Sequence, residues 1–156
     1  DALQDLLETP VLGVEWDRIS FMIYSSMYIG YSGGMITRRD AEYMIYDYCR
    51  SARRILGERA AVSLGVTGKG VLEDEPTYQS VEELRRDAEV AKAAGIEDIA
   101  IYNLEGILSS PNPSAWFECV VSASPRIPPW SFKIPLIRAS TMVGDKIISW
   151  IRRVKS

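Results

Sequence analysis

The sequence contains no histidine, and this absence excludes several kinds of catalytic site. A Ser-His-Asp triad or a Cys-His pair needs an imidazole, and so does a His-ligated zinc site. Acid–base chemistry would therefore fall to Asp, Glu, Lys or Tyr side chains. We expect neither a metal site nor a cofactor.

Cysteine is scarce as well, because Cys49 and Cys119 are the only two. They could form one disulfide but no disulfide framework. Each lies in an apolar stretch that favours a helix, where cysteine behaves as a small core residue, and we favour that role. The redox compartment and the localisation stay open.

Long apolar runs and an excess of positive charge are also missing. No apolar run reaches the length of about 18 residues that a membrane span needs. The net charge of −3 argues against a protein that binds nucleic acid through bulk positive charge. The length of 156 residues fits a single globular domain over residues 1–156. Because the first residue is Asp1, we expect that residues were removed or that the chain is part of a longer protein.

Three apolar stretches alternate with two amphipathic ones, which predicts an α/β fold with the order β-α-β-α-β. Strands are expected at residues 19–24, 60–66 and 98–104, and helices at 37–57 and 80–95. Both helices begin at a sequence that can cap them and end at a glycine. The nearly continuous apolar run of the first strand predicts burial on both faces, as in a parallel sheet.

The connections that follow the predicted strands are long, whereas those that follow the helices are short. Residues 25–36 and 67–79 are expected to form loops of about a dozen residues, a length that is uncommon unless the loop is functional. In α/β folds the functional site lies at the carboxyl ends of the strands. We therefore expect a site where residues 24–28 change from apolar to hydroxyl-bearing and aromatic side chains.

Charged residues near the predicted strand ends are candidates for chemistry. Glu105 follows the third strand, and a carboxylate there suits sugar hydrolysis, although a lone acid at this position more often caps a helix or binds a backbone amide. Lys69 lies in "GVTGKG", which lacks the phosphate-loop pattern, but its amine could contact a substrate. The acids at 73–75 are expected to form a solvated cluster rather than a cation site.

Tyrosines form the second group of candidates. Tyr24, Tyr28 and Tyr102 fall at or beyond the predicted strand ends, as do Tyr31 and Tyr78. A flat ring with a polar tip suits the face of a sugar or another amphipathic ligand. We therefore predict that Tyr24, Tyr28 and Tyr102 bind substrate together with Lys69.

The last third of the chain, residues 112–156, is predicted to be helical and rich in proline. A helix is expected to begin at Pro113, and the four prolines within residues 124–135 predict an extended segment. A final helix is expected over residues 137–154, with a basic end. The basic charge suits a helix C-terminus, which we favour, but docking on a partner or a membrane surface remains an alternative.

Three stretches resemble consecutive strands of one enzyme family. "DRISFMIYS", "AVSLGVTGKG" and "GIEDIAIYNLEGI" resemble the sixth, seventh and eighth strands of the family 18 glycoside hydrolases, the chitinase-like barrels. Asp17, Met22 and Tyr24 match the sixth-strand pattern, and Tyr102 stands where the family has a tryptophan. The resemblance implies the later βα units of a (β/α)8 TIM barrel and a carbohydrate or other small-molecule ligand.

The sequence also departs from that family. The catalytic D-x-x-D-x-D-x-E motif has no counterpart, and Ser25 replaces the aspartate that follows the sixth-strand tyrosine. Three strands cannot close an eight-stranded barrel, so the remainder of a barrel or a second chain is an expected partner. We predict a glycoside-hydrolase-like domain in which Glu105 is a helper. The alternative is a non-enzymatic structural or interaction domain with an open α/β sheet, whose basic amphipathic C-terminal helix docks on a partner or a membrane surface.

Overall fold

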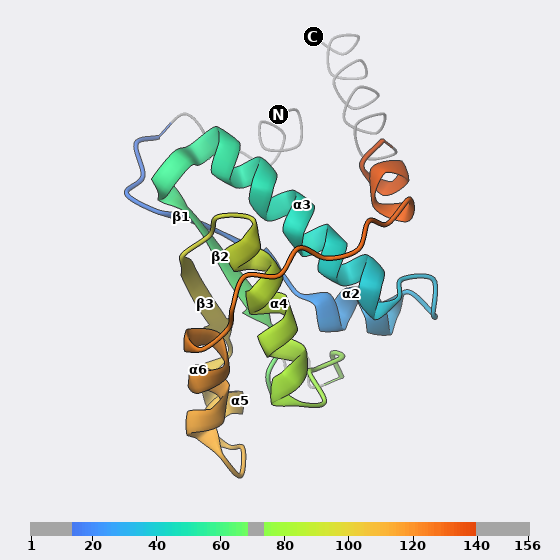
Figure 1. Ribbon diagram of the computed structural model, residues 1–156. Helices are drawn as coiled ribbons and strands as arrows, with labels where there is room; N and C mark the ends of the chain where they lie inside the picture. Colours follow the sequence, from blue (N-terminus) through green and yellow to red (C-terminus); the bar gives the residue numbers. More distant parts are fainter. Residues whose placement is uncertain (1–13, 69–73, 140–156) are drawn as a thin grey trace, which may run out of the picture. The chain divides into compact units, whose positions relative to one another are not determined.

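A computed structural model describes residues 14–68 and 74–139 of the chain (Figure 1). The chain divides into two compact units. The larger unit is Arg18–Trp130, and the smaller one combines Asp1–Asp17 with Ser131–Ser156. Every strand of the described residues belongs to the larger unit.

The larger unit has the predicted β-α-β-α-β order. Its strands are β1 (Ile19–Ile23), β2 (Ala60–Gly65) and β3 (Asp98–Tyr102). They form a parallel sheet in the order β1-β2-β3, and the two crossovers contain the helices α3 (Arg38–Leu56) and α4 (Val81–Ala93). The prediction of a parallel α/β fold is therefore confirmed.

The two crossover helices begin differently. At α3 the predicted cap is present: the Asp40 carboxylate accepts a hydrogen bond from the Thr37 amide at 3.0 Å, and the Thr37 side chain accepts one from the Asp40 amide. At α4 the predicted capping box is not formed, because the Ser80 side chain makes no capping hydrogen bond. Glu83 instead accepts from the Gln79 amide at 2.6 Å, one residue further back than a capping box requires.

The two faces of the sheet have different side chains. Helices α3 and α4 cover one face of the sheet (Figure 1). Ile23, Val62 and Leu64 belong to this face, and all three are buried. Met22 and its register partner Ser63 lie on the opposite face, where Met22 is 68% exposed. The prediction that β1 is buried on both faces is therefore wrong. An alternating strand with one open face explains the pattern better, because successive side chains point to opposite sides.

Three shorter helices complete the larger unit: α2 (Ser25–Tyr31), α5 (Leu104–Leu108) and α6 (Pro113–Val121). The prediction that residues 25–36 form a loop throughout is wrong, because α2 starts directly after β1. The third strand ends two residues earlier than predicted, since Asn103 caps α5 by accepting a hydrogen bond from the Gly106 amide at 2.6 Å.

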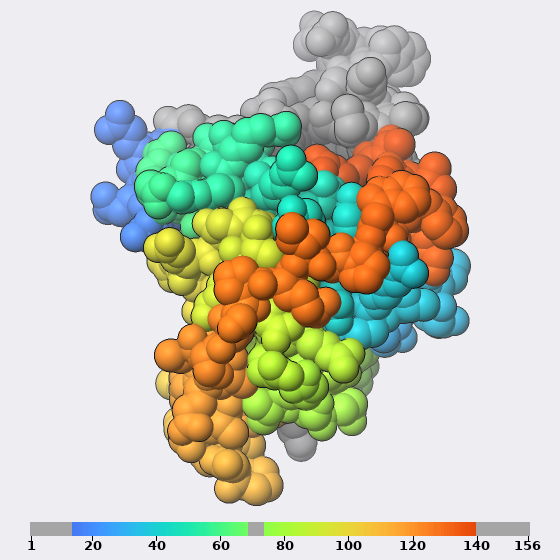
Figure 2. Space-filling view, viewed as in Figure 1, coloured from blue at the N-terminus to red at the C-terminus, as the bar shows by residue number. Residues whose placement is uncertain are grey.

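The chain between α6 and residue 131 has no regular structure. Figure 2 shows this segment, in orange, running over the helical layer. The Arg126 amide donates to the Glu89 carbonyl at 3.1 Å, and its guanidinium pairs with the Glu89 carboxylate at 2.8 Å and with Glu42 at 3.1 Å. Arg39 donates to the Trp130 carbonyl at 2.9 Å. The helices are thus held between the sheet and this proline-rich segment.

The predicted extended segment at 124–135 ends earlier than expected. Residues 133–139 are helical, and Pro135 lies in the first turn, where proline is tolerated. Most of the predicted basic helix at 137–154 lies outside the described residues, of which 137–139 are helical.

The expectations for the two cysteines and for membrane-spanning helices can be compared with the described residues. Cys49 and Cys119 are both buried free thiols, which confirms their role as small core residues. No helix of the described residues is both long and apolar enough to cross a membrane.

Candidate functional site

The carboxyl ends of the strands bring two predicted tyrosines together. Tyr24 follows β1, and Tyr102 ends β3, with Gly65 of β2 between them. The two rings stack with centroids 5.2 Å apart and planes 17° apart. A Cβ atom on Gly65 would lie 2.6 Å from the Tyr102 carbonyl oxygen and 3.2 Å from the Tyr24 ring. The absence of a side chain at Gly65 therefore lets the rings meet across the central strand.

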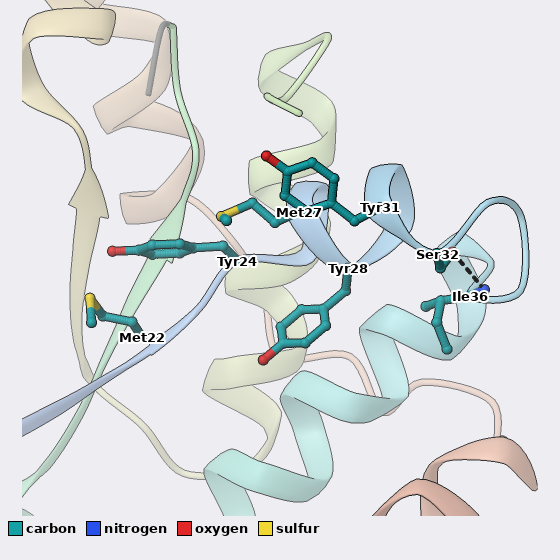
Figure 3. Close-up of a pocket in the computed structure, with 7 residues that line it drawn as sticks. All are labelled: Met22, Tyr24, Met27, Tyr28, Tyr31, Ser32 and Ile36. Atoms are coloured by element: carbon teal, nitrogen blue, oxygen red, sulfur yellow. Dashed lines mark hydrogen bonds between the residues drawn. The ribbon is translucent and has the colours of Figure 1, made fainter. Parts of the chain in front are cut away.

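A cavity of about 510 Å³ adjoins this stack (Figure 3). It is lined by Met22, Tyr24, Met27, Tyr28, Tyr31, Ser32 and Ile36. Tyr24, Met27, Tyr28 and Tyr31 follow the i, i+3, i+4, i+7 spacing of one helix face, which is why α2 presents them together. Figure 3 shows Met22 and Tyr24 entering from the sheet and the other side chains from α2 and the turn after it. The cavity is therefore largely aromatic and apolar.

Ser26 fastens α2 to the end of β2. Its buried hydroxyl donates a hydrogen bond to the Gly65 carbonyl at 3.2 Å and accepts one from the Val66 amide at 2.9 Å. These two backbone groups lie where the ladder between the strands ends. The hydroxyl thus satisfies both and fixes the start of the helix that carries the cavity's tyrosines.

A buried polar cluster supports the same helix from the other side. Asp87 of α4 is fully buried, and its carboxylate accepts hydrogen bonds from Ser25, Tyr78 and Arg38, that from Tyr78 at 2.6 Å. Arg38 also donates to the Ser25 hydroxyl at 3.2 Å and to the Glu83 carbonyl at 3.1 Å. The cluster joins the first residues of α2 and α3 to the middle of α4.

The electrostatics of this cluster follow from its burial. Burial raises the pKa of Asp87, although Arg38 and the two hydroxyl donors act in the opposite direction. Burial also raises the pKa of Tyr78 well above its usual value, and the negative charge of Asp87 adds to this. Tyr78 therefore stays a hydrogen-bond donor. Sequence reasoning placed Tyr78 among the strand-end tyrosines, but its hydroxyl is used inside the protein.

The loops after β2 and β3 are joined by backbone contacts. The Thr67 amide donates to the Tyr102 carbonyl at 2.8 Å, and its hydroxyl donates to the Asn103 carbonyl at 2.8 Å. Gly68 has φ +65°, and a Cβ atom on it would lie 2.3 Å from the Gly106 Cα. Glycine at both positions permits this close approach. The Gly65–Val66 and Tyr102–Asn103 peptide bonds are cis.

The structure places the predicted site residues differently. Tyr24 and Tyr28 line the cavity, and Tyr102 stacks on Tyr24. Glu105 lies in the first turn of α5, where it is exposed and does not line the cavity. Lys69 lies outside the described residues. The proposed roles of Glu105 and Lys69 remain predictions.

Glu75 is a residue of this region that sequence reasoning assigned to a solvated cluster. It is only partly exposed, and its Oε2 atom is enclosed without a hydrogen-bond partner in the described parts of the chain. Burial raises the pKa of Tyr24, a hydrogen bond from Ser63 lowers it, and the charges of Tyr102 and Glu75 raise it further. Burial likewise raises the pKa of Tyr28. These phenols therefore stay protonated at neutral pH and can donate hydrogen bonds.

The arrangement offers a stack of rings, phenol donors and an adjacent carboxylate. Across residues 14–68 and 74–139, no group of three or more Cys, Asp or Glu side chains could hold a metal ion. No protein-family model matches the chain, and comparisons with curated proteins and with solved structures find no match. The similarity to family 18 glycoside hydrolases therefore rests on the sequence motifs alone.

Proposed function

We propose that the carboxyl-end face of this sheet binds a carbohydrate. The observation that carries the proposal is the Tyr24–Tyr102 stack over Gly65, beside a cavity of about 510 Å³. Aromatic rings bury the apolar face of a sugar, while phenol groups donate hydrogen bonds to its hydroxyls. A cavity of this size falls in the range that small-molecule sites occupy.

We further propose that the chain is a glycoside-hydrolase-like domain, which its parallel α/β fold supports. The parallel strands would be later βα units of a TIM barrel, and the open face with Met22 and Ser63 would be its interior side. The remaining strands would come from the rest of a barrel or from a second chain. Glu105 would then orient the sugar, and the main catalytic acid would lie on those other strands.

The test is ligand-observed saturation-transfer NMR with a panel of oligosaccharides. Tyr24→Ala and Tyr102→Ala should each abolish the transfer, because each removes one ring of the stack. Phe117→Ala is the matched control, since it removes a ring that is 43% exposed on α6 and does not line the cavity. Glu105→Ala tests the helper role separately. A folded wild-type protein that receives no transfer from any sugar would refute carbohydrate binding.

One observation favours a second candidate, a non-enzymatic interaction domain. The outer surfaces of α5 and α6 expose the apolar side chains Leu104, Leu108, Phe117 and Val121, with exposed fractions from 43% to 80%. Large exposed apolar patches are typical of protein contacts. Binding of a sugar that depends on Tyr24 and Tyr102 would favour the first candidate over this one.

A further inference from the structure

The loop that carries Glu75 is held against the helix of the aromatic cavity. Pro76 packs on Gly30 of α2 so closely that a Cβ atom on Gly30 would lie 2.3 Å from the Pro76 side chain. The Tyr78 amide donates to the Val66 carbonyl at 2.8 Å and holds the other end of this segment at the end of β2. These two contacts, both just after Glu75 in the chain, place it near α2 and the end of β2.

The charges that act on the site's phenols are negative. Glu75 acts on Tyr24, and Asp74 and Glu75 both act on Tyr31, whose pKa is raised first by partial desolvation and then by these two acids. Tyr31 lines the cavity from α2, and Glu75 directly precedes Pro76, which packs on Gly30 of the same helix, so Glu75 lies beside this helix although it is not one of the lining residues. The faces of aromatic rings also carry a negative electrostatic potential. Ring faces and a nearby carboxylate together favour a cation over a neutral group.

The Glu75 carboxylate has capacity for a ligand. Its Oε2 atom is enclosed and accepts no hydrogen bond from the described residues, a state that costs free energy until a donor reaches it. A protonated amine brings three donors and a positive charge, and such charge-assisted hydrogen bonds are about twice as strong as neutral ones. A sugar hydroxyl brings one donor and no charge.

We propose that this site selects a sugar that carries a protonated amino group, with Glu75 as the residue that determines the preference. The inference rests on the proposed function, since it takes the ligand to be a carbohydrate. The Tyr24–Tyr102 stack would hold the sugar ring, and Glu75 would pair with the amine at the edge of the cavity. Glu75 acts in binding only, and no reaction step is assigned to it.

The experiment compares two oligosaccharides of equal length, one built from glucosamine and one from glucose, at a pH at which the amine is protonated. Calorimetric titration of the wild-type chain should give an affinity about fivefold or more higher for the glucosamine oligomer, as expected for one close charge pair near water. The difference should shrink as salt is added, because salt screens the charge pair.

Glu75→Gln should abolish the preference, because the amide keeps the size of the side chain and loses its charge. Glu118→Gln is the matched control, since it changes the net charge by the same amount at an exposed position on α6. It should leave both affinities unchanged.

Equal binding of the two oligomers by the wild type would overturn the inference and leave carbohydrate binding intact. A preference that survives in Glu75→Gln would also overturn it, because another group would then recognise the amine. Binding of neither oligomer would overturn the inference and the proposed function together.

Discussion

The buried pair of Asp87 and Arg38 yields the most quantitative prediction. Asp87 is fully buried, and the Arg38 side chain is 21% exposed. Asp87→Ala would leave the guanidinium and two hydroxyls without their acceptor, which should lower the free energy of unfolding by about 3–5 kcal/mol. The control is Glu82→Ala on the same helix, because Glu82 also pairs with arginines, Arg85 at 2.7 Å and Arg86 at 3.5 Å, but is 46% exposed. We expect its loss to be below about 1 kcal/mol.

The same pair makes a second, sharper test possible. Burial is the dominant effect on the pKa of Asp87 and raises it, so desolvation outweighs the stabilisation of the charge by Arg38. Replacing both partners with apolar residues, as in Asp87→Leu with Arg38→Met, removes that cost along with the attraction. The loss in the free energy of unfolding should therefore be smaller in the double variant than the sum of the losses in the two single variants, by at least about 2 kcal/mol.

Urea unfolding followed by circular dichroism measures the free energy of unfolding of the wild type and of all five variants. The slopes of the transitions must agree among the variants for the comparison to hold. A loss below about 1 kcal/mol for Asp87→Ala, or strict additivity of the two substitutions, would show that the cluster is solvated and that the reasoning from its burial is wrong.

Three further predictions concern the site and the core. Gly65→Ala should lower the free energy of unfolding by about 1–3 kcal/mol and weaken sugar binding, because the new Cβ would meet the Tyr102 carbonyl. Thermal unfolding would measure the first effect and calorimetric titration the second. Ser26→Ala should cost about 1–3 kcal/mol in urea unfolding, because it leaves two buried backbone groups unpaired, and an unchanged midpoint would contradict this. Burial raises the pKa of Cys49 to about 12 and that of Cys119 to about 11. At pH 8 the thiolate fraction is therefore only about one in ten thousand for Cys49 and about one in a thousand for Cys119. A thiol reagent at pH 8 should therefore label two groups after unfolding and neither quickly before it, whereas rapid labelling of the folded chain would refute the burial of both.

The order of strands and crossover helices could be predicted because each element carries local signals. The helix α3 has an apolar stripe, a Thr37–Asp40 cap and Gly57 at its end, all visible in the sequence. The strands are short apolar runs between turn residues. In each case the information lies within about one element's length of chain, so no tertiary contact was needed.

The open face of the sheet and the helix α2 were harder to predict. Methionine is apolar, so the run from Ile19 to Tyr24 reads as continuously buried even though Met22 faces outward. The expectation of a loop over residues 25–36 hid the short helix α2 at its start. The signal that could have revealed α2 is the helical spacing of its aromatic and methionine side chains from Tyr24 onward.

The buried cluster could not be found from the sequence. Asp87 lies on the apolar face of α4, three residues after Leu84 and four before Ala91, which indicates burial but says nothing of its partners. Its partners Arg38 and Ser25 lie 49 and 62 residues away, so the cluster exists only once the crossovers have packed. Glu75 was expected in a solvated cluster, and the enclosure of its Oε2 atom likewise depends on tertiary packing that the local sequence does not show.

The most direct test of a carbohydrate site on this face is chemical-shift mapping of the ¹⁵N-labelled chain with a sugar added. Shifts should concentrate in the amides of residues 22–31, 63–66 and 101–103, which surround the Tyr24–Tyr102 stack and the cavity. Shifts confined to α5 and α6 would contradict this prediction and favour the interaction surface. No shift at saturating sugar would show that this face does not bind carbohydrate.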